Sequence, residues 1–330
     1  MFTFSDRGAA MSLTLSQLRA FVAVAERGSI RAAARALDTA QSGLTQQLQS
    51  LEQTLGATLF TRTNRGIALT SFGERLMLRA GAILRECERT EREMAQLRGE
   101  SGGVVSLGVT TEPLIDTFAP VLMQFRARFD NVAVHLMGGT SRAMIAWIRD
   151  GTLDFAVGLV SASTDVSDLA VTALYPSDPV IVCRRGHPLA HATSLSELAD
   201  CHWIATRAPK QAGMLPTNRL VDLFAAHALS PPKIVATTEA VFDTLHLIVE
   251  TDCLSLEPSV VTRHRLFAGA LVAVPIRERA ERSNICLLQR AGVPLTPAAQ
   301  ELAAMIASYA RTVRRGDRDA SAVAVRAPAS

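Results

Sequence analysis

The residue types best placed to recognise a partner are four polar side chains that share one face of a predicted helix. Gln41, Ser42, Thr45 and Gln46 stand at positions i, i+1, i+4 and i+5 within the segment 39–55, and this spacing puts them on one side of a helix. Amide and hydroxyl groups can hydrogen-bond to base edges in the major groove of DNA. A merely solvated helix face would carry similar residues, so the neighbouring segments decide between the two interpretations.

A predicted β-hairpin with a basic tip follows this helix. Residues 60–70 read FTRTNRGIALT, in which two β-prone stretches flank a turn at Asn64-Arg65-Gly66. Arginines near such a turn can contact phosphate groups, and Ser29 can cap a short preceding helix. The candidate DNA-binding residues are therefore Ser29, Gln41, Ser42, Thr45, Gln46, Arg62 and Arg65.

Sequence motifs of catalysis or metal binding are absent from the chain. There is no glycine-rich phosphate loop, no GxSxG, no HExxH and no set of cysteines and histidines with the spacing of metal ligands. His187 lies in RRGHPLA, where we expect a structural role in a turn. Cys201 and Cys253 form a peroxide-sensing pair only if the fold brings them together. We therefore predict no catalytic residue, no metal and no cofactor.

Three short helices are predicted to position the polar face. Apolar residues recur at helical spacing along the N-terminal third, which predicts helices over 15–27, 30–37 and 39–55. Thr39 is the expected N-terminal cap of the third helix. Gly56 is its expected C-terminal residue, because a left-handed conformation there favours glycine.

A long uninterrupted helix is predicted over residues 71–98. Its apolar residues alternate at spacings of four and three, the pattern of a coiled-coil seam. A long helix with one narrow apolar stripe is not stable alone in water, so we expect this stripe to pack against a second copy of the chain. The candidate dimerisation residues are Leu76, Ile83, Met94 and Leu97.

The pattern changes to strands from residue 104 onward. Short β-prone runs alternate with amphipathic stretches long enough for helices; the runs are VVSLGV, VAVHLM, FAVGLV, VIVC, KIVAT, LVAVP and NICLLQ. This alternation predicts an α/β fold with mostly parallel sheets. Beyond residue 311 the chain is polar and rich in alanine and arginine, so we predict a disordered tail over 311–330.

Composition and charge narrow the class of protein. The 330 residues are 48% hydrophobic and 20% charged, which excludes wholesale disorder and suits about two domains. No apolar run is long enough for a membrane span or a signal peptide, and five scattered cysteines without a CxxC pair fit a reducing cytoplasm. Residues 1–98 carry 13 arginines against 9 acidic residues, whereas the remainder carries 21 basic and 22 acidic residues. This asymmetry favours nucleic acid as a partner, although so small an excess also fits chance.

The order and spacing of many residues resemble those of LysR-type transcriptional regulators. The N-terminal matches include Gly28-Ser29, Ala33-Ala34, Leu44-Thr45, Leu51-Glu52, Leu55-Gly56, Leu59-Phe60, Arg62, Leu69-Thr70 and Gly73. Stretches that resemble the family's effector domain are FAPVLMQFRARFDNVAVHLMGG, IRDGTLDFAVG, RRGHPLA and VPLTPAAQEL. The resemblance covers residues 13–310. Ile30, Gly43 and Gln46 depart from the family pattern, which leaves the preferred DNA sequence open.

The resemblance implies an α/β fold class with an N-terminal winged helix-turn-helix, a long linker helix and a two-subdomain α/β effector domain similar to periplasmic solute-binding proteins. The expected division is an extension over 1–12, the winged helix-turn-helix over 13–70, the dimerisation helix over 71–98, the effector domain over 99–310 and the tail over 311–330. Subdomain one is expected over 104–174 plus 276–310 and subdomain two over 175–272, with crossings near 174–176 and 273–275. The family also implies a homodimer or homotetramer.

Strand-end loops supply the candidate effector site. Ligands of open α/β sheets bind beyond the carboxyl ends of strands, near helix N-termini. The resemblance favours Thr111 and Thr140 most, because similar positions bind effectors in family members, whereas plain N-capping is the alternative for each loop. The candidate residues are Thr110, Thr111, Thr140, Ser141, Thr206 and Arg207. Arg207 and the helix N-termini would favour a carboxylate or another small anion.

The predicted function is therefore sequence-specific, DNA-binding regulation of transcription, controlled by a small-molecule effector bound between the two α/β subdomains. The expected partners are double-stranded DNA, the effector and further copies of the chain, with no membrane, and the expected location is the cytoplasm. Two alternatives have less support. A solute-binding receptor needs export, for which no signal peptide is present, and an enzyme needs a catalytic constellation that the sequence lacks.

Overall fold

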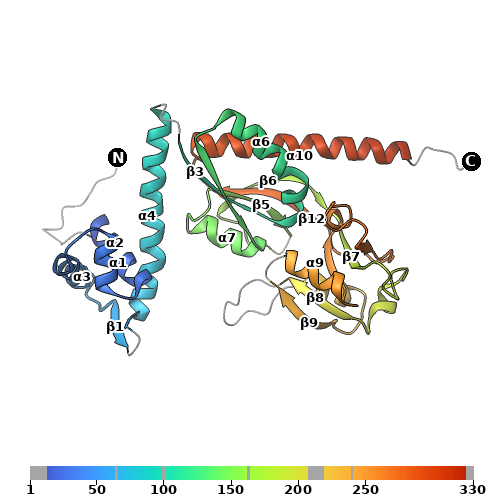
Figure 1. Cartoon of the computed structure of the whole chain (residues 1–330), viewed down its shortest axis with the longest axis horizontal. Helices are drawn as coiled ribbons and strands as arrows, with labels where there is room; N and C mark the ends of the chain where they lie inside the picture. Colours follow the sequence, from blue (N-terminus) through green and yellow to red (C-terminus); the bar gives the residue numbers. More distant parts are fainter. Residues whose placement is uncertain are drawn as a thin grey trace, which may run out of the picture. The chain divides into compact units, whose positions relative to one another are not determined.

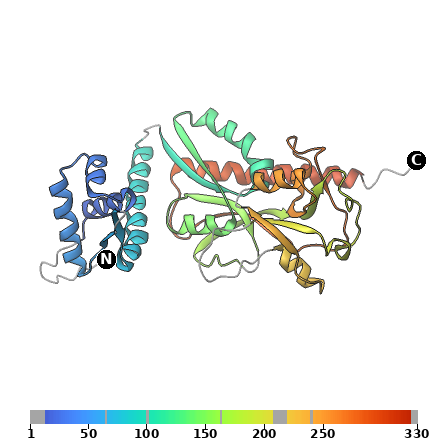
Figure 2. The same ribbon diagram turned by 60° about the horizontal axis from the view of Figure 1, so that its bottom comes forward.

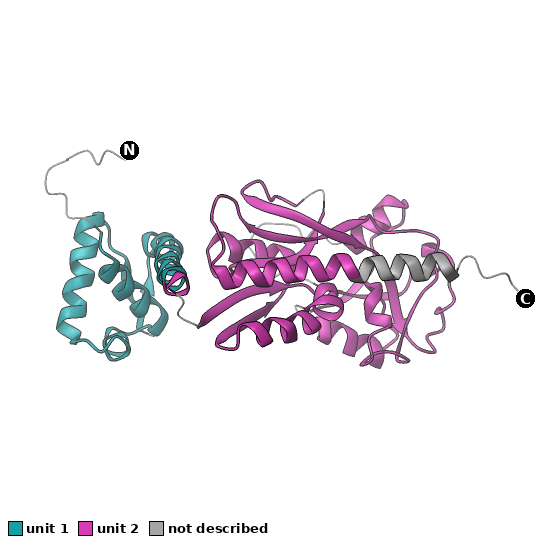
Figure 3. Ribbon diagram, turned by 90° about the horizontal axis from the view of Figure 1, so that it is seen from above, with its two compact units in different colours: residues 1–94 teal, residues 95–330 magenta. Residues whose placement is uncertain are grey.

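The structure is a computed structural model that describes residues 13–63, 66–98, 102–161, 164–206, 219–238 and 241–324. The chain divides into unit 1, residues 1–94, and unit 2, residues 95–330, which are coloured separately in Figure 3. Each unit has hydrophobic core clusters of its own. None of the described helices combines the length and the apolar character that crossing a membrane requires.

Unit 1 begins with three helices around one apolar core. They are α1 (Leu15–Arg27), α2 (Ile30–Ala36) and α3 (Gln41–Leu55), the blue ribbons of Figure 2. Phe21, Leu44 and Leu51 are fully buried among them. The apolar stripes that predict the helices therefore face one another, and this burial stabilises segments too short to be helical alone.

Local hydrogen bonds set the starts and ends of these helices. Ser29 Oγ accepts from the backbone N of Ala32 at 3.4 Å and caps α2, as predicted. The prediction for α3 needs correction, because Ala40 is its cap residue and makes no side-chain cap hydrogen bond. The backbone N of Thr39 instead donates to a carbonyl oxygen of α2 at 3.0 Å, so Thr39 belongs to the turn. Gly56 ends α3 at a φ of 65°, where glycine is favoured.

A hairpin and the start of a long helix complete unit 1. β1 (Phe60–Thr63) pairs antiparallel with β2 (Gly66–Leu69), which confirms the predicted hairpin. The backbone N of Ile67 donates to Gly28 O at 3.2 Å and ties the hairpin to the end of α1. The predicted long helix is α4 (Ser71–Leu97). Gly73 lets its first turn approach the hairpin, since a Cβ there would lie only 2.2 Å from Leu59 O.

Unit 2 contains a five-stranded sheet with helices on both faces. The strand order is β4-β3-β5-β12-β6; the bounds are β3 Gly103–Val109, β4 Val132–Gly138, β5 Phe155–Val160, β6 Leu169–Ser177 and β12 Ser283–Arg290. A short helix α5 (Thr111–Pro113) and one π-helical turn (Leu114–Phe118) lead from β3 into α6 (Ala119–Arg128). α6 and α10 (Pro297–Ala324) cover one face, and α7 (Ser141–Arg149) covers the other (Figure 1).

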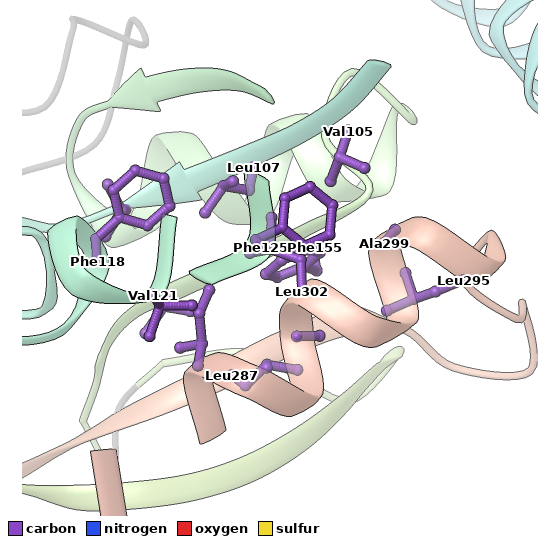
Figure 4. Close-up of a cluster of buried hydrophobic side chains, with 14 of the residues drawn as sticks. Val105, Leu107, Phe118, Val121, Phe125, Phe155, Leu287, Leu295, Ala299 and Leu302 are labelled. Carbon is purple, nitrogen blue, oxygen red and sulfur yellow. The ribbon is translucent and has the colours of Figure 1, made fainter. Parts of the chain in front are cut away.

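The core of this first subdomain lies between the sheet and the α6–α10 layer. Figure 4 shows Phe125 of α6 and Leu302 of α10 beside Leu107 and Phe155 of the sheet. All four side chains are fully buried. The alternation of strand and helix in the sequence is thus the alternation of layers in the fold.

The second subdomain of unit 2 is built on two smaller sheets. β7 (Pro179–Arg184) lies between β10 (Ser255–Pro258) and β11 (Leu271–Ala273), and β8 (His202–Thr206) pairs with β9 (Lys233–Thr238). The helices are α8 (Arg219–Ala226) and α9 (Val241–Glu250), with 3-10 turns at Leu195–Leu198 and Ser259–Thr262. Trp203 is fully buried in this core, edge-on to Phe224 at a ring-centroid distance of 5.4 Å.

The structure corrects three predictions about unit 2. Its sheets are mixed rather than mostly parallel: β12 runs antiparallel to β5 and β6, because β6 and β12 carry the chain between the subdomains in opposite directions. Ile276 and Ala280 pack with the core of the second subdomain, so the return crossing lies after residue 280 and not near 273–275. α10 continues to Ala324, so residues 311–324 are helical, as suits their alanine and arginine content.

Candidate nucleic-acid interface and ligand cavity

α3 presents a polar face on the side away from the core. Gln41, Ser42 and Gln46 are exposed and Thr45 is half-buried, whereas Leu44 is fully buried. Thr45 Oγ1 donates to Gln41 O at 2.9 Å, and its lone pairs can still accept a hydrogen bond. The structure therefore brings the four predicted residues together on one accessible face of a helix that fits a major groove.

Basic side chains stand on the elements beside α3. Arg62 is exposed on β1, whereas Arg65 lies outside the described residues. Ser29 is half-buried and caps α2, so its hydroxyl already has a structural role. The sequence-based set omits Arg31 and Arg35, which are exposed on α2. In a helix-turn-helix the first helix crosses the DNA backbone, so two arginines on α2 are suited to phosphate contacts.

One part of the predicted apolar seam of α4 packs in the core of unit 1, and the other part is exposed. Leu76 is half-buried against the core of unit 1, whereas Ile83 is 42% exposed and Met94 and Leu97 are also exposed. Phe72 is 64% exposed and missing from the predicted set. Phe72, Ile83 and Met94 are spaced by 11 residues, close to three helical turns, and therefore share one face. An exposed apolar stripe of this kind indicates a protein-binding surface.

A cavity of about 710 Å³ lies within unit 2, lined by both α/β subdomains. Thr110, Thr111, Thr140 and Ser141 line it from the first subdomain, which is the placement expected for strand-end loops. Thr140 Oγ1 accepts from the backbone N of Ala143 at 3.4 Å and so caps α7. Thr110 Oγ1 is buried and has no hydrogen-bond partner among the described residues.

Two buried carboxyl groups line the same cavity from opposite subdomains. Glu112 of α5 accepts a hydrogen bond from Ser177 Oγ at 2.5 Å. Glu257 of β10 is 4% exposed and accepts from Ser255 Oγ at 2.8 Å. Burial raises the pKa of Glu257 to about 7, and the hydrogen bond from Ser255 opposes part of that rise.

Arg219 at the start of α8 is the cation among the described residues that line the cavity. Its guanidinium donates to the carbonyl oxygen of Glu281 at 2.9 Å. Burial lowers the pKa of Arg219, and the carboxylates of Glu112 and Glu281 act against this. Its charge is thus already partly compensated within the protein.

The rest of the cavity wall is largely apolar. The π-helical turn contributes Leu114 and Ile115, so the widened helical turn lies at the cavity, as such turns often lie at functional sites. Phe242 and Phe267 line the other subdomain with their ring centroids 6.1 Å apart and their planes tilted by 54°. An apolar enclosure with a few convergent polar groups is typical of a small-molecule site.

Comparison with known proteins identifies both units. Residues 15–74 match the bacterial regulatory helix-turn-helix of the lysR family, and residues 98–311 match the LysR substrate binding domain. The HTH-type transcriptional regulator GbpR of Azospirillum brasilense is 27% identical over 307 residues, 92% of this chain and 89% of GbpR. The SDS degradation transcriptional activation protein of a Pseudomonas species is 30% identical over 299 residues, 88% of this chain and 95% of that protein.

The chain belongs to the LysR family of transcriptional regulators. The crystal structure of full-length CbnR with its target DNA has the same fold, with a TM-score of 0.64 at 21% identity over 91% of this chain and 99% of CbnR. LysR regulators combine a DNA-binding helix-turn-helix with an effector-binding domain and act as oligomers. This LysR-family chain is therefore a DNA-binding transcriptional regulator controlled by a small-molecule effector.

The effector residues predicted for this LysR-family chain have different outcomes. Thr110, Thr111, Thr140 and Ser141 come together at the cavity, but their contact with an effector stays a prediction. Thr206 lies at the end of β8 and Arg207 outside the described residues. Sequence reasoning missed Glu112, Arg219 and Glu257. Glu112 follows Thr111 directly and was open to the same strand-end reasoning, whereas nothing local marks Arg219 or Glu257 as cavity residues.

The histidine and cysteines singled out by sequence take structural positions. His187 is buried and accepts from the backbone N of Leu189 at 3.0 Å, in agreement with the predicted turn. Cys201 and Cys253 pack against different core clusters, and all five cysteines are free thiols. Burial raises the pKa of Cys201, which disfavours its reactive thiolate. No disulfide joins the two cysteines, although the bridge between Trp203 and Leu254 brings the segments that carry them side by side.

Proposed function

We propose that this regulator reads DNA with the N-terminal half of α3, with Gln41, Ser42, Thr45 and Gln46 facing the base edges and Ser29, Arg62 and Arg65 facing phosphates. The observation that carries this proposal is the exposure of Gln41, Ser42 and Gln46 on α3 while its leucines Leu44, Leu48 and Leu51 are buried. Exposed arginines on α2 and β1 flank it. Side chains at the start of a recognition helix read bases, and flanking cations set its register.

The proposed oligomer is a homodimer, or a homotetramer built from such dimers, joined through the stripe of Ile83, Met94 and Leu97. Support comes from the exposure of these apolar side chains along a helix of 27 residues. Two copies of α3 related by symmetry would then read half-sites separated by about one helical turn of DNA or a multiple of it. We place this activity in the cytoplasm, where chromosomal DNA is accessible.

The proposed effector site is the cavity between the subdomains, with Thr110, Thr111, Thr140 and Ser141 as contacts and Thr206 and Arg207 completing it from the second subdomain. The domain division predicted from the sequence is part of this proposal, with the return crossing moved beyond residue 280. The role is regulatory rather than catalytic. A ligand that contacts both subdomains favours their closed arrangement, and this difference in affinity is what can alter DNA binding.

The experiment that tests the DNA half compares two glutamine variants. A cognate site is first selected from a random DNA library by the wild-type protein, and gel shifts then compare that site with random DNA. Gln41→Ala should lose about ten- to a hundredfold affinity for the cognate site while keeping its affinity for random DNA. Gln53→Ala is the matched control, because Gln53 is exposed at the far end of the same helix. Equal losses on both DNAs for Gln41→Ala would remove its assigned role in reading bases.

A further inference from the structure

We infer that the cavity of unit 2 selects a ligand with an ammonium group on an apolar body, with Glu257 as the counter-charge and the Phe242–Phe267 ring pair as part of the same cavity wall. This inference rests on the proposed function, in which the same cavity is the effector site. It names the chemical class of the effector. It also departs from the small anion expected on the strength of Arg207, a residue outside the described part of the chain.

The first step is the state of Glu257 in the empty cavity. It is 4% exposed, and Ser255 is its hydrogen-bond partner among the described residues. No arginine or lysine of the described chain forms an ion pair with it. A buried carboxyl without a cation favours its neutral form, and burial accordingly raises the pKa of Glu257. A cation delivered into the cavity would remove this penalty, whereas a ligand carboxylate would increase it.

The second step is the charge of the remaining wall. The other described titratable groups that line the cavity are Glu112, Arg219 and His264. Arg219 already donates to Glu281 O and interacts with the carboxylate of Glu112. Glu112 brings a second carboxyl from the opposite subdomain. Two carboxyls against one compensated guanidinium and one histidine favour a positive ligand group over a negative one.

The third step is the aromatic pair. Phe242 is 64% exposed although it is a large apolar residue, and its ring lies 6.1 Å from that of Phe267. Ring faces in a cavity that also holds a carboxyl are suited to alkylammonium groups, because the electron-rich face of a ring attracts a cation. The ring of Phe242 also lies parallel to that of His246, with the centroids 6.5 Å apart. Leu114 and Ile115 supply apolar wall for the body of such a ligand. The residues thus match a cation with a hydrophobic substituent.

The test uses benzyltrimethylammonium, a cation that does not titrate, and phenylacetate, an anion of similar size, in isothermal titration calorimetry on the full chain. Benzyltrimethylammonium should bind the wild type about tenfold more tightly at pH 8 than at pH 6, because Glu257 ionises between these values. At pH 7 its binding should release about half a proton, measured in two buffers of different ionisation enthalpy. Phenylacetate should bind more weakly at every pH.

Variants assign the effect to named side chains. Glu257→Gln keeps the shape and should bind benzyltrimethylammonium at least tenfold more weakly at pH 8, without proton release. Glu250→Gln is the matched control, because Glu250 is an exposed carboxylate at the end of α9 in the same subdomain. Phe242→Leu, a change at an exposed position, should weaken binding about three- to fivefold. Native tryptophan fluorescence verifies that each variant is folded.

The possible outcomes separate this inference from the function on which it rests. Failure of benzyltrimethylammonium to bind, tighter binding of phenylacetate, or wild-type affinity in Glu257→Gln would each overturn the ammonium assignment. If phenylacetate binds in the cavity and changes operator affinity, the proposed effector site survives and its ligand class is anionic. If benzyltrimethylammonium binds as expected but leaves operator affinity unchanged, the ligand chemistry holds and effector control through this cavity fails.

Discussion

Replacing Glu257 with glutamine should change how the stability of this protein depends on pH, even without a ligand. The carboxyl is 4% exposed, and its pKa rises from 4.5 to about 7 because of burial. A group whose pKa is higher in the folded than in the unfolded state stabilises the fold below the unfolded value. This stabilisation is lost as the pH rises from about 4.5 to 7. Glutamine stays neutral and carries no such dependence.

The magnitude follows from the two pKa values. One pKa unit corresponds to about 1.4 kcal/mol, so a shift from 4.5 to about 7 implies a total loss of roughly 3 kcal/mol. About 2.5 kcal/mol of this loss falls between pH 5 and pH 8, because the unfolded carboxyl is already partly ionised at pH 5. Glu257→Gln should therefore gain about 2.5 kcal/mol relative to wild type over that interval.

Urea unfolding followed by tryptophan fluorescence can measure this difference. The chain has two tryptophans, and Trp203 is buried in the same subdomain as Glu257. A Trp147→Phe background leaves Trp203 as the reporter. Glu250→Gln, at an exposed carboxylate, should differ from wild type by less than about 0.5 kcal/mol at both pH values. A Glu257→Gln difference that is the same at pH 5 and pH 8 would refute the reasoning, because Glu257 would then not be a desolvated titrating group.

Three further predictions concern the other surfaces. Ile83→Glu should halve the sedimenting mass and weaken DNA binding, because it would bury a charge in the proposed interface. Leu78→Glu, at a 69% exposed position on the opposite side of α4, should leave the assembly intact. Equal behaviour of the two variants would place the interface elsewhere. Arg62→Ala should weaken binding to cognate and random DNA alike and reduce the salt dependence, and a change in sequence preference would contradict a phosphate contact. Thr110→Val should cost no stability in urea, since its hydroxyl lacks a partner, but should weaken effector binding about tenfold; unchanged affinity would exclude that hydroxyl from the site.

Much of the fold could be predicted because its signals are local. Helix periodicity, Ser29 as a cap and Gly56 as a terminator all act within a few residues, and α1–α3 lie where these signals put them. Thr39 shows the limit of such reasoning. It has the right chemistry for a cap, but its backbone N bonds back to α2, so the helix starts one residue later. Which of two adjacent residues caps a helix depends on the preceding turn, which propensity does not describe.

The errors in unit 2 have a long-range cause. The sequence pattern does not identify β6, because LAVTALYPS contains no uniform apolar alternation. The strand nevertheless pairs with β12, which lies more than 100 residues further along the chain. Strand direction depends on that pairing, so a sequence pattern that identifies strands does not reveal whether they run parallel. The prediction of a disordered tail is wrong for residues 311–324 for another reason, and residues 325–330 lie outside the described part of the chain. The residues of this tail are polar, as in disordered segments, but alanine and arginine are also strong helix formers, and the segment extends α10.

Some residues of the candidate site could be predicted from local sequence signals, and others depend on long-range strand pairing. Thr110 and Thr140 could be found because the carboxyl end of a strand and the start of a helix are visible in the sequence. Glu257 could not, because β10 is a short strand whose burial pattern alternates, and only the pairing with β7 turns this carboxyl toward the core. The residues that set the charge of the cavity are thus less predictable than those that shape its rim. A ligand class inferred from the sequence alone therefore rests on the strand-end loop residues and leaves out buried wall residues such as Glu257.

The positions of the two buried carboxyls suggest how ligand chemistry and regulation are joined. Glu112 belongs to the helix that follows the first strand of one subdomain, and Glu257 to a strand of the other. If a ligand draws the two subdomains together, the carboxylates of Glu112 and Glu257 would repel each other more strongly as the distance between them falls, which would oppose closure. Under the proposed assignment, a ligand cation between them would offset that repulsion and so would bind a closed arrangement more tightly than an open one. Differential affinity of this kind is what an effector needs in order to shift a population of conformations. The same two side chains would then set both which ligand enters the cavity and whether its arrival alters DNA binding.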